Sequence, residues 1–345
     1  MTDYKTLNEA LIAQQDSSNG VTFIEGKHEQ HTVSYPQLYE RAMMMLYDLQ
    51  QQGLTVGDHL IILQKDNPAF VETFWACVFG GIIPVPIAVG VSDEHKGKLF
   101  RIFNKLERPH LYTTQEHFDR LSQFAETNNL HESLQIFKAK TVFANLLEDH
   151  AHRGQAHNPA EEDIALIQFS SGSTSEPKGV VLTHRNVMNN INAIQVATNY
   201  SADDVSLSWM PLTHDMGLLG FHLSRVAIGM KQYLMPTDLF SRRPLLWMEK
   251  VSEFKVTITC SPNFGYKHYL KALKCKMPEG LDLSSVRHIY NGAEPISIDL
   301  CEQFLSTLKD SGLKYESMFT VYGLAEASLA VTFPAPGSGV QSLHV

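Results

Sequence analysis

Between two apolar runs, the chain carries a polar stretch whose residue types suit phosphate binding. Residues 164–168 have the length and the β-branched side chains of a buried strand, and residues 180–182 are predicted to form the next strand. The stretch between them supplies hydroxyls, two glycines and one cation: Ser170, Ser171, Gly172, Ser173, Thr174, Lys178 and Gly179. Glycine lets main-chain N–H groups turn inward around an anion, and the lysine can offset its charge. We therefore expect a phosphate loop here rather than an ordinary Ser/Gly turn, and not the Walker type, because a glycine and a valine follow the lysine.

A second segment with chemical potential is PLTHDMGLLG at residues 211–220. It places His214 and Asp215 after a proline and before a glycine, which is typical of a loop that opens a helix. A histidine at this point can hydrogen-bond the oxygens of a reacting phosphoryl or carboxylate group, whereas an aspartate can simply cap the helix. We expect a catalytic role for His214, while for Asp215 substrate binding and helix capping both stay open.

The run SSGSTSEPKGVVLTH at residues 170–184 resembles the phosphate loop of adenylate-forming enzymes, the group of acyl-CoA synthetases, luciferases and peptide-synthetase adenylation domains. Four further motifs follow in that family's order and look most like those of fatty acyl-AMP ligases: SWMPLTHDMGLLG at 208–220, SPNFGY at 261–266, NGAEPIS at 291–297 and YGLAEASLAVTFPAPG at 322–337. The resemblance covers residues 7–336. It implies attack of a carboxylate on the α-phosphate of ATP, with loss of pyrophosphate.

The resemblance also implies roles for single residues. Lys178 would offset the charge of the β- and γ-phosphates, and Thr174 and Glu326 would bind Mg²⁺. Lys178, His214 and Glu326 form the expected catalytic set. The expected adenine pocket consists of a stacking tyrosine and small or polar residues at strand ends: Asn291, Gly292, Ala293, Glu294, Tyr322 and Gly323. The alternatives are a core position for Tyr322 and a solvated helix start for Glu326.

The expected acyl-binding residues lie in two of the motifs: His214, Asp215, Met216, Gly217, Asn263 and Phe264. Neighbouring apolar residues either line a tunnel for an alkyl chain or belong to the core: Met210, Leu218, Leu219, Phe221 and Tyr269. We expect a fatty acid as substrate and an acyl carrier protein as acceptor. CoA as acceptor, and a non-catalytic nucleotide- or acyl-binding fragment, stay open as alternatives.

Composition fits a soluble cytoplasmic enzyme. The chain has 345 residues, of which 43% are hydrophobic and 19% charged, and a net charge of −9 argues against nucleic acid as a partner. The four cysteines lack metal-ligand spacing, and the N-terminus lacks the pattern of a signal peptide. Residues 74–91 are uncharged, but Pro84 and Pro86 argue against a transmembrane helix. We expect a buried helix over 67–79 and an extended segment over 82–87 instead.

Helical and strand patterns alternate, which predicts an α/β fold of layered, largely parallel sheets flanked by helices. Helices are predicted at 35–52, 68–79, 96–106, 115–126, 184–198, 244–253, 263–274 and 298–308. Strands are predicted at 59–63, 82–87, 110–112, 164–168, 180–182, 205–207, 232–234, 256–259, 286–290 and 317–321. By resemblance, residues 1–345 form an incomplete large N-terminal domain with interleaved layers, 1–160 and 161–345. Because the family continues into a ribose-binding aspartate and a catalytic lysine, we expect these residues alone to be weakly active or inactive.

Overall fold

The computed structural model describes residues 3–90, 92–144, 151–169, 176–274 and 278–342. The chain divides into two compact units. The larger unit comprises Met1–Tyr4, Asp16–Tyr35 and Met188–Val345, and the smaller unit comprises Lys5–Gln15 and Pro36–Val187. The predicted division near residue 160 stays a prediction. Helix α7 (His184–Thr198) begins in the smaller unit and continues into the larger one.

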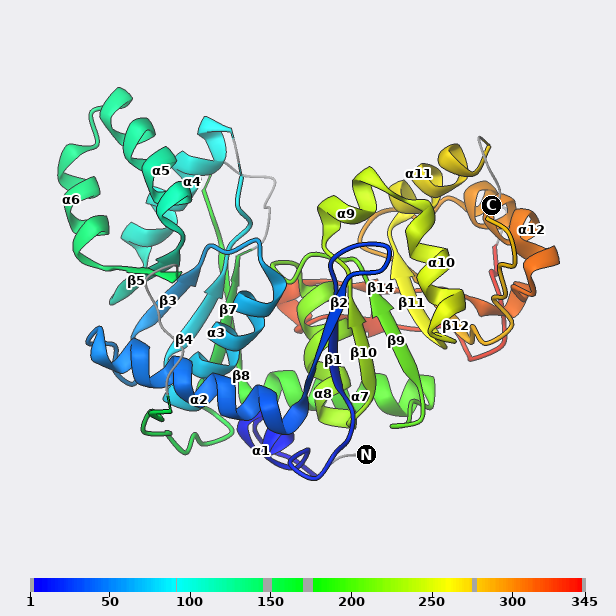
Figure 1. The fold of residues 1–345 in the computed structure, drawn as a ribbon, viewed down its shortest axis with the longest axis horizontal. Helices are drawn as coiled ribbons and strands as arrows, with labels where there is room; N and C mark the ends of the chain where they lie inside the picture. The colour runs from blue at the N-terminus through cyan, green and yellow to red at the C-terminus, as the bar shows by residue number, and fades with distance from the viewer. Residues whose placement is uncertain (1–2, 91, 145–150, 170–175, 275–277, 343–345) are drawn as a thin grey trace. The chain divides into compact units, whose positions relative to one another are not determined.

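The larger unit is built on a seven-stranded sheet, whose strands lie side by side in Figure 1. Their order is β13 (Met318–Thr320), β12 (His288–Asn291), β11 (Ile258–Ser261), β9 (Val205–Ser208), β10 (Lys231–Leu234), β1 (Gly20–Ile24) and β2 (Gln30–Ser34). Every pair is parallel except the β1–β2 hairpin at the edge. The carboxyl ends of the parallel strands therefore meet at one edge of the sheet, where ligands bind in open α/β folds.

Helices and short turns connect these strands. They are η2, a π-helix (Met216–Leu223), α8 (Ser224–Ile228), α9 (Thr237–Arg242), α10 (Leu245–Glu253), α11 (Asn263–Leu273), α12 (Ile298–Leu308) and the 3₁₀ turns η3 (Lys309–Ser311), η4 (Tyr315–Ser317) and η5 (Ala325–Ala327). A short antiparallel pair, β14 (Tyr322–Gly323) and β15 (Ala330–Thr332), surrounds η5. The motif segments thus follow strands β9, β11, β12 and β13.

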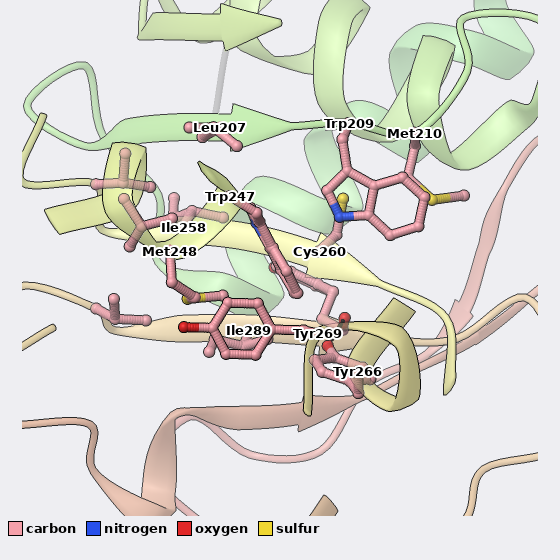
Figure 2. Packing of buried hydrophobic residues seen from close by; sticks show 14 of the residues in the cluster. Leu207, Trp209, Met210, Trp247, Met248, Ile258, Cys260, Tyr266, Tyr269 and Ile289 are labelled. Carbon is pink, nitrogen blue, oxygen red and sulfur yellow. Dashed lines mark hydrogen bonds between the residues drawn. The ribbon is translucent and has the colours of Figure 1, made fainter. Parts of the chain in front are cut away.

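An aromatic core holds this unit together. The indole of Trp209 stacks on the ring of Phe240 with 3.9 Å between centroids, and Trp247 crosses the Trp209 indole at 6.1 Å. Figure 2 shows both indoles close to Cys260 on β11. The Trp247 Nε1–H donates to Thr259 Oγ1 at 2.9 Å, so the buried indole keeps a hydrogen bond. Met210 and Tyr269 belong to this core. Of the two alternatives for these residues, an alkyl tunnel or a core position, the core position is the one observed.

The smaller unit contains a parallel sheet in the order β4 (Ile83–Pro86), β3 (His59–Ile62), β5 (Pro109–Thr113) and β6 (Thr141–Phe143). An antiparallel pair, β7 (Ile164–Phe169) and β8 (Gly179–Thr183), packs against β4. The helices are α1 (Leu7–Ile12), α2 (Tyr35–Gln51), α3 (Asn67–Gly80), α4 (Asp93–Lys105), α5 (Gln115–Thr127) and α6 (His131–Ala139). Together the two sheets confirm the predicted α/β class.

The predicted buried helix and extended segment occur as α3 and β4. Asp66 caps α3 by accepting from the N–H of Ala69, and Gly81 ends the helix at a φ of 63°. Pro84 and Pro86 lie in β4, whose residues are buried. Among the described residues, no helix is both long enough and apolar enough to cross a bilayer.

Candidate functional site

Several motif residues of the larger unit converge on one pocket of about 150 Å³. Six of them were predicted as site residues: His214, Asp215, Met216, Ala293, Tyr322 and Gly323. The remaining lining is mostly apolar: Ile194, Gly220, Phe221, Arg225, Tyr290, Val321, Leu329, Ala330 and Phe333. The lining follows the carboxyl ends of β9, β12 and β13, where the topology of a parallel sheet places ligand-binding residues.

His214 and Asp215 form a close pair at the start of η2. The Nδ1 atom of His214 lies 2.7 Å from Oδ1 of Asp215, and that oxygen also accepts from the N–H of Met216 at 2.6 Å. Asp215 therefore caps the helix, as one interpretation predicted, and also orients the imidazole. The N–H of Met216 also lies 3.2 Å from Nδ1 of His214, so both contacts engage this ring atom. Nε2 is left as the ring atom that a ligand can reach, since the His214 side chain is 43% exposed.

Gly217 fixes the turn that presents this pair. A Cβ atom at this position would stand 2.3 Å from the carbonyl oxygen of Pro211, which is closer than real Cβ contacts allow. The following residues form a π-helix, a rare element that is frequent at functional sites. Gly217 itself is outside the pocket lining, so the structure gives it a positioning role beside the predicted substrate-binding one.

The NGAEPIS and SPNFGY motifs bind each other. Nδ2 of the buried Asn291 donates to Oδ1 of Asn263 at 3.0 Å, and Nδ2 of Asn263 donates to the carbonyl of Pro295. Glu294 accepts from the N–H of Phe264 at 3.0 Å. These four predicted residues, Asn263, Phe264, Asn291 and Glu294, lie outside the pocket lining, as does Gly292.

Ala293 alone from NGAEPIS lines the pocket. Its φ is 69°, in the left-handed region where a side chain costs about 1 kcal/mol. Such local strain clusters at ligand sites, because the surrounding structure must impose it. Here the hydrogen bonds of the neighbouring Asn291 and Glu294 do so, and they hold the Ala293 backbone against the pocket.

Tyr322 is exposed rather than in the core, with 60% of its surface accessible. It lines the pocket beside Gly323, whose missing Cβ would clash with the carbonyl oxygen of Leu329 at 2.0 Å. Asn190 on α7 holds the turn between β14 and β15, because its amide bonds the N–H and the carbonyl of Ala330 at 3.0 and 2.9 Å. Sequence reasoning missed Asn190, since a lone asparagine in a helix gives no signal.

Glu326 lies in η5 and fits the part of a magnesium ligand. Its carboxylate is exposed and takes part in no ion pair with the described residues. Mg²⁺ commonly takes one or two protein carboxylates and completes its shell with waters and phosphates. The described residues contain no cluster of three or more acidic, histidine or cysteine side chains that would hold a metal alone.

The predicted phosphate loop belongs to the smaller unit. Ser170, Ser171, Gly172, Ser173 and Thr174 lie outside the described residues. Lys178 is exposed, and no ion pair to it occurs within the described ranges. Gly179 is the first residue of β8, so the predicted loop segment lies between two strands as expected, and these strands pair antiparallel, which was not predicted. The amine of Lys105 on α4 pairs with Glu176 at 2.9 Å and donates to the carbonyl of Pro177 at 3.1 Å.

Arg225 is the pocket residue that sequence reasoning missed most clearly. It lies in α8 within the apolar run of residues 218–230, and only 1% of its surface is exposed. An arginine inside such a run is unusual, because charged side chains are almost never fully buried without a partner. That single charge in an apolar helix was the available signal.

Residues 12–343 match the family described as AMP-binding enzyme. A medium-chain-fatty-acid–[acyl-carrier-protein] ligase from Moorena producens is 28% identical over 95% of this chain and 56% of its own length. A putative acyl-CoA synthetase from Caulobacter vibrioides is 30% identical over 99% of the chain and 59% of its own length. The solved fatty acyl-adenylate ligase from L. pneumophila, in complex with acyl adenylate and pyrophosphate, superimposes with a TM-score of 0.88 at 30% identity, over 98% of this chain and 58% of that one. The chain thus spans a little over half the length of these relatives, and it belongs to the AMP-binding enzyme family.

Proposed function

We propose that an enzyme containing this chain activates a fatty acid as its acyl-adenylate, using ATP and Mg²⁺, and transfers the acyl group to an acyl carrier protein. The observation that carries the proposal is the convergence of His214, Ala293 and Tyr322 on one largely apolar pocket. The relatives named as a fatty-acid ligase and a fatty acyl-adenylate ligase support the reaction class.

The pocket residues have complementary tasks in this reaction. A carboxylate oxygen attacks the α-phosphorus of ATP, a new P–O bond forms, and the bond to the pyrophosphate oxygen breaks. Nε2 of His214 hydrogen-bonds the crowded oxygens of the carboxylate and α-phosphate. The exposed ring of Tyr322 offers a flat face to adenine, while the main chain of Ala293 and Gly323 approaches it closely.

Two further residues act on the phosphates. Lys178, with the loop hydroxyls of Ser170 to Thr174, offsets the charge of the β- and γ-phosphates. Glu326 and Thr174 would hold Mg²⁺, which when bound would offset negative charge on the phosphates and on the departing pyrophosphate. The charged residues therefore act on the pyrophosphate leaving group, while the pocket binds the acyl chain and the adenosine of the acyl-adenylate.

The test is calorimetry on this chain with a non-hydrolysable octanoyl-sulfamoyl adenosine. We expect micromolar or tighter binding, which His214→Ala weakens about tenfold and Tyr322→Ala about ten- to hundredfold. Tyr315→Ala is the matched control, since Tyr315 is 46% exposed and lies outside the pocket lining. Absence of binding by the unaltered chain, or equal effects of the three substitutions, would overturn the proposal.

A CoA acceptor is the second candidate, and the putative acyl-CoA synthetase from Caulobacter vibrioides favours it. The two candidates share adenylate formation and differ in the nucleophilic thiol. An enzyme that contains this chain is loaded with radiolabelled octanoyl-AMP and then mixed with either CoA or a phosphopantetheinylated carrier protein. Label on the carrier protein supports the first candidate, and label on CoA supports the second.

We also propose a cytoplasmic location. Cys77, Cys260 and Cys301 are free and buried, as expected for a reducing compartment. Cell fractionation with an epitope-tagged enzyme tests this location, and recovery in a secreted or membrane fraction contradicts it.

A further inference from the structure

The pocket of the larger unit contains a buried cation. Arg225 lines the pocket although only 1% of its surface is exposed. A charged group removed from water costs several kcal/mol unless an opposite charge and hydrogen bonds compensate it. Interactions with the surrounding protein or with a ligand must therefore offset the cost of burying this guanidinium.

The surrounding protein compensates Arg225 only in part. Its guanidinium lies over the rings of Tyr200 and Phe221, 4.6 and 4.5 Å from their centroids, and Nη1 donates to Ser224 Oγ at 3.2 Å. Its Nε–H is buried and has no partner in the part of the chain that the structure describes. A side-chain hydrogen bond also joins Arg225 to the hydroxyl of Tyr200. These contacts supply ring faces and two neutral oxygens but no anion.

The nearby carboxylates are used elsewhere. Both oxygens of Asp204 accept from Nη1 of Arg287, at 2.7 and 2.9 Å. Asp215, the acidic residue of the pocket lining, is bound to His214 and to the N–H of Met216. Arg225 accordingly forms no ion pair within the described residues.

Arg225 also stands apart from the proposed reacting centre. Helices η2 and α8 run on from Met216 to Ile228, and both Met216 and Arg225 line the pocket. Nine residues separate them along these helices, which at a rise of about 1.5 Å per residue or somewhat less places their Cα atoms on the order of 10 to 14 Å apart along the axis. The wall of the pocket between them is apolar, with Gly220 and Phe221 on the same helix.

We propose that Arg225 binds a carboxylate at the far end of the acyl chain, so that the preferred substrate is a medium-length dicarboxylic acid. This rests on the function proposed above. The apolar wall packs against the methylene groups, His214 faces the carboxylate that reacts, and the guanidinium of Arg225 supplies the counter-charge to the second carboxylate. A guanidinium fork suits this partner, because it presents parallel N–H donors to two carboxylate oxygens.

The experiment compares two non-hydrolysable adenylates of equal chain length on this chain: octanoyl-sulfamoyl adenosine and its 7-carboxyheptanoyl counterpart. Calorimetry on the unaltered protein should show about ten- to hundredfold tighter binding of the carboxylated compound, the fold-change expected for a charged hydrogen-bonded pair. Arg225→Met should abolish or reverse this preference while octanoyl binding persists. Arg242→Met is the matched control, because Arg242 is exposed and pairs with Asp238 outside the pocket.

The outcomes separate the two proposals. Binding of the octanoyl compound without a preference for the carboxylated one, or a preference that survives Arg225→Met, overturns the inference and leaves adenylate binding standing. Binding of neither compound overturns both proposals. If Arg225→Met does not fold, Arg225→Lys replaces it, because lysine keeps the charge but lacks the fork, and the preference should then fall but not reverse.

Discussion

The carboxylate of Glu294 accepts a hydrogen bond from the backbone N–H of Phe264 at 3.0 Å, across thirty residues of sequence. Phe264 is the second residue of α11, and the preceding Pro262 offers no side-chain cap. The first N–H groups of a helix need acceptors, and a negative charge there also suits the helix dipole. Glu294 thus serves as the cap that α11 lacks, and this bond joins the NGAEPIS and SPNFGY motifs.

Glu294→Ala should therefore destabilise the larger unit by about 0.5 to 2 kcal/mol, the range for loss of an N-cap. Glu294→Gln keeps an acceptor oxygen and should lose less. Urea unfolding followed by fluorescence measures both, with Glu302→Ala on the exposed face of α12 as control. An alanine variant as stable as the parent would show that the bond contributes nothing.

Gly217→Ala should disturb the His214–Asp215 pair. The added methyl would press on the carbonyl of Pro211, so the turn must shift by about an ångström or more to restore van der Waals distance. We expect at least a tenfold loss in affinity for the octanoyl adenylate analogue. Gly97→Ala is the control, because a methyl group at Gly97 would meet only ordinary van der Waals contacts. Gly280 is unsuitable because its φ of 69° disfavours alanine. Unchanged affinity in Gly217→Ala, alongside the Gly97→Ala control, would remove the positioning role.

Elements with a clear residue composition and clear start and stop signals could be predicted from the sequence. The α3 helix with its proline start and Gly81 end, and the β7 and β8 strands, occur where the pattern placed them. Short elements that depend on partners were missed. The β1–β2 hairpin completes the edge of a sheet whose other strands lie about two hundred residues later in the sequence. The local hydrophobic pattern does not indicate which distant strand a segment pairs with.

The site was predictable as motifs but not as contacts. The six residues that converge on the pocket all lie in motifs, whereas the hydrogen bonds of Asn263, Asn291 and Glu294 to one another needed the fold. Arg225 and Asn190 lie in helices with no motif, so only the structure gives them a role.

Lys105→Met should loosen the arm of the phosphate loop that precedes β8. Lys105 pairs with Glu176 and holds the carbonyl of Pro177, and this pair lowers the pKa of the Glu176 carboxyl through the hydrogen bond and the charge of the lysine. Without it, Glu176 and Pro177 lose the contact that fixes them next to Lys178, so we expect a two- to fivefold weaker Kd for ATP.

Calorimetry with ATP measures this effect, and Lys105→Arg is the control that retains a cation. Because the pair is exposed, the difference between Lys105→Met and the parent should shrink at high salt. Equal ATP affinity of Lys105→Met and the parent at low salt would mean that the contact has no influence on the loop.

Acid should destabilise the larger unit through two buried histidines. Burial lowers the pKa of His222 to about 4 and that of His288 to about 4, whereas both groups titrate near 6.5 when unfolded. Between pH 6.5 and 4 the unfolded chain binds more protons than the folded one, so the free energy of unfolding falls as the pH falls. The slope is about 1.4 kcal/mol per pH unit for each histidine.

The variant His222→Gln isolates one of these contributions. Nδ1 of His222 lies 2.9 Å from Oε1 of Gln232 in the fully buried interior, and a glutamine can keep a donor there without titrating. Between pH 6.5 and 4.5, the free energy of unfolding of His222→Gln should fall by about 1 to 3 kcal/mol less than that of the parent. This holds even if the variant is less stable than the parent at pH 7.5. Urea unfolding at pH 4.5, 5.5, 6.5 and 7.5 measures the slopes. If the free energy of unfolding changes with pH equally in parent and variant, His222 is protonated in the folded state as well. That result would contradict a neutral buried imidazole.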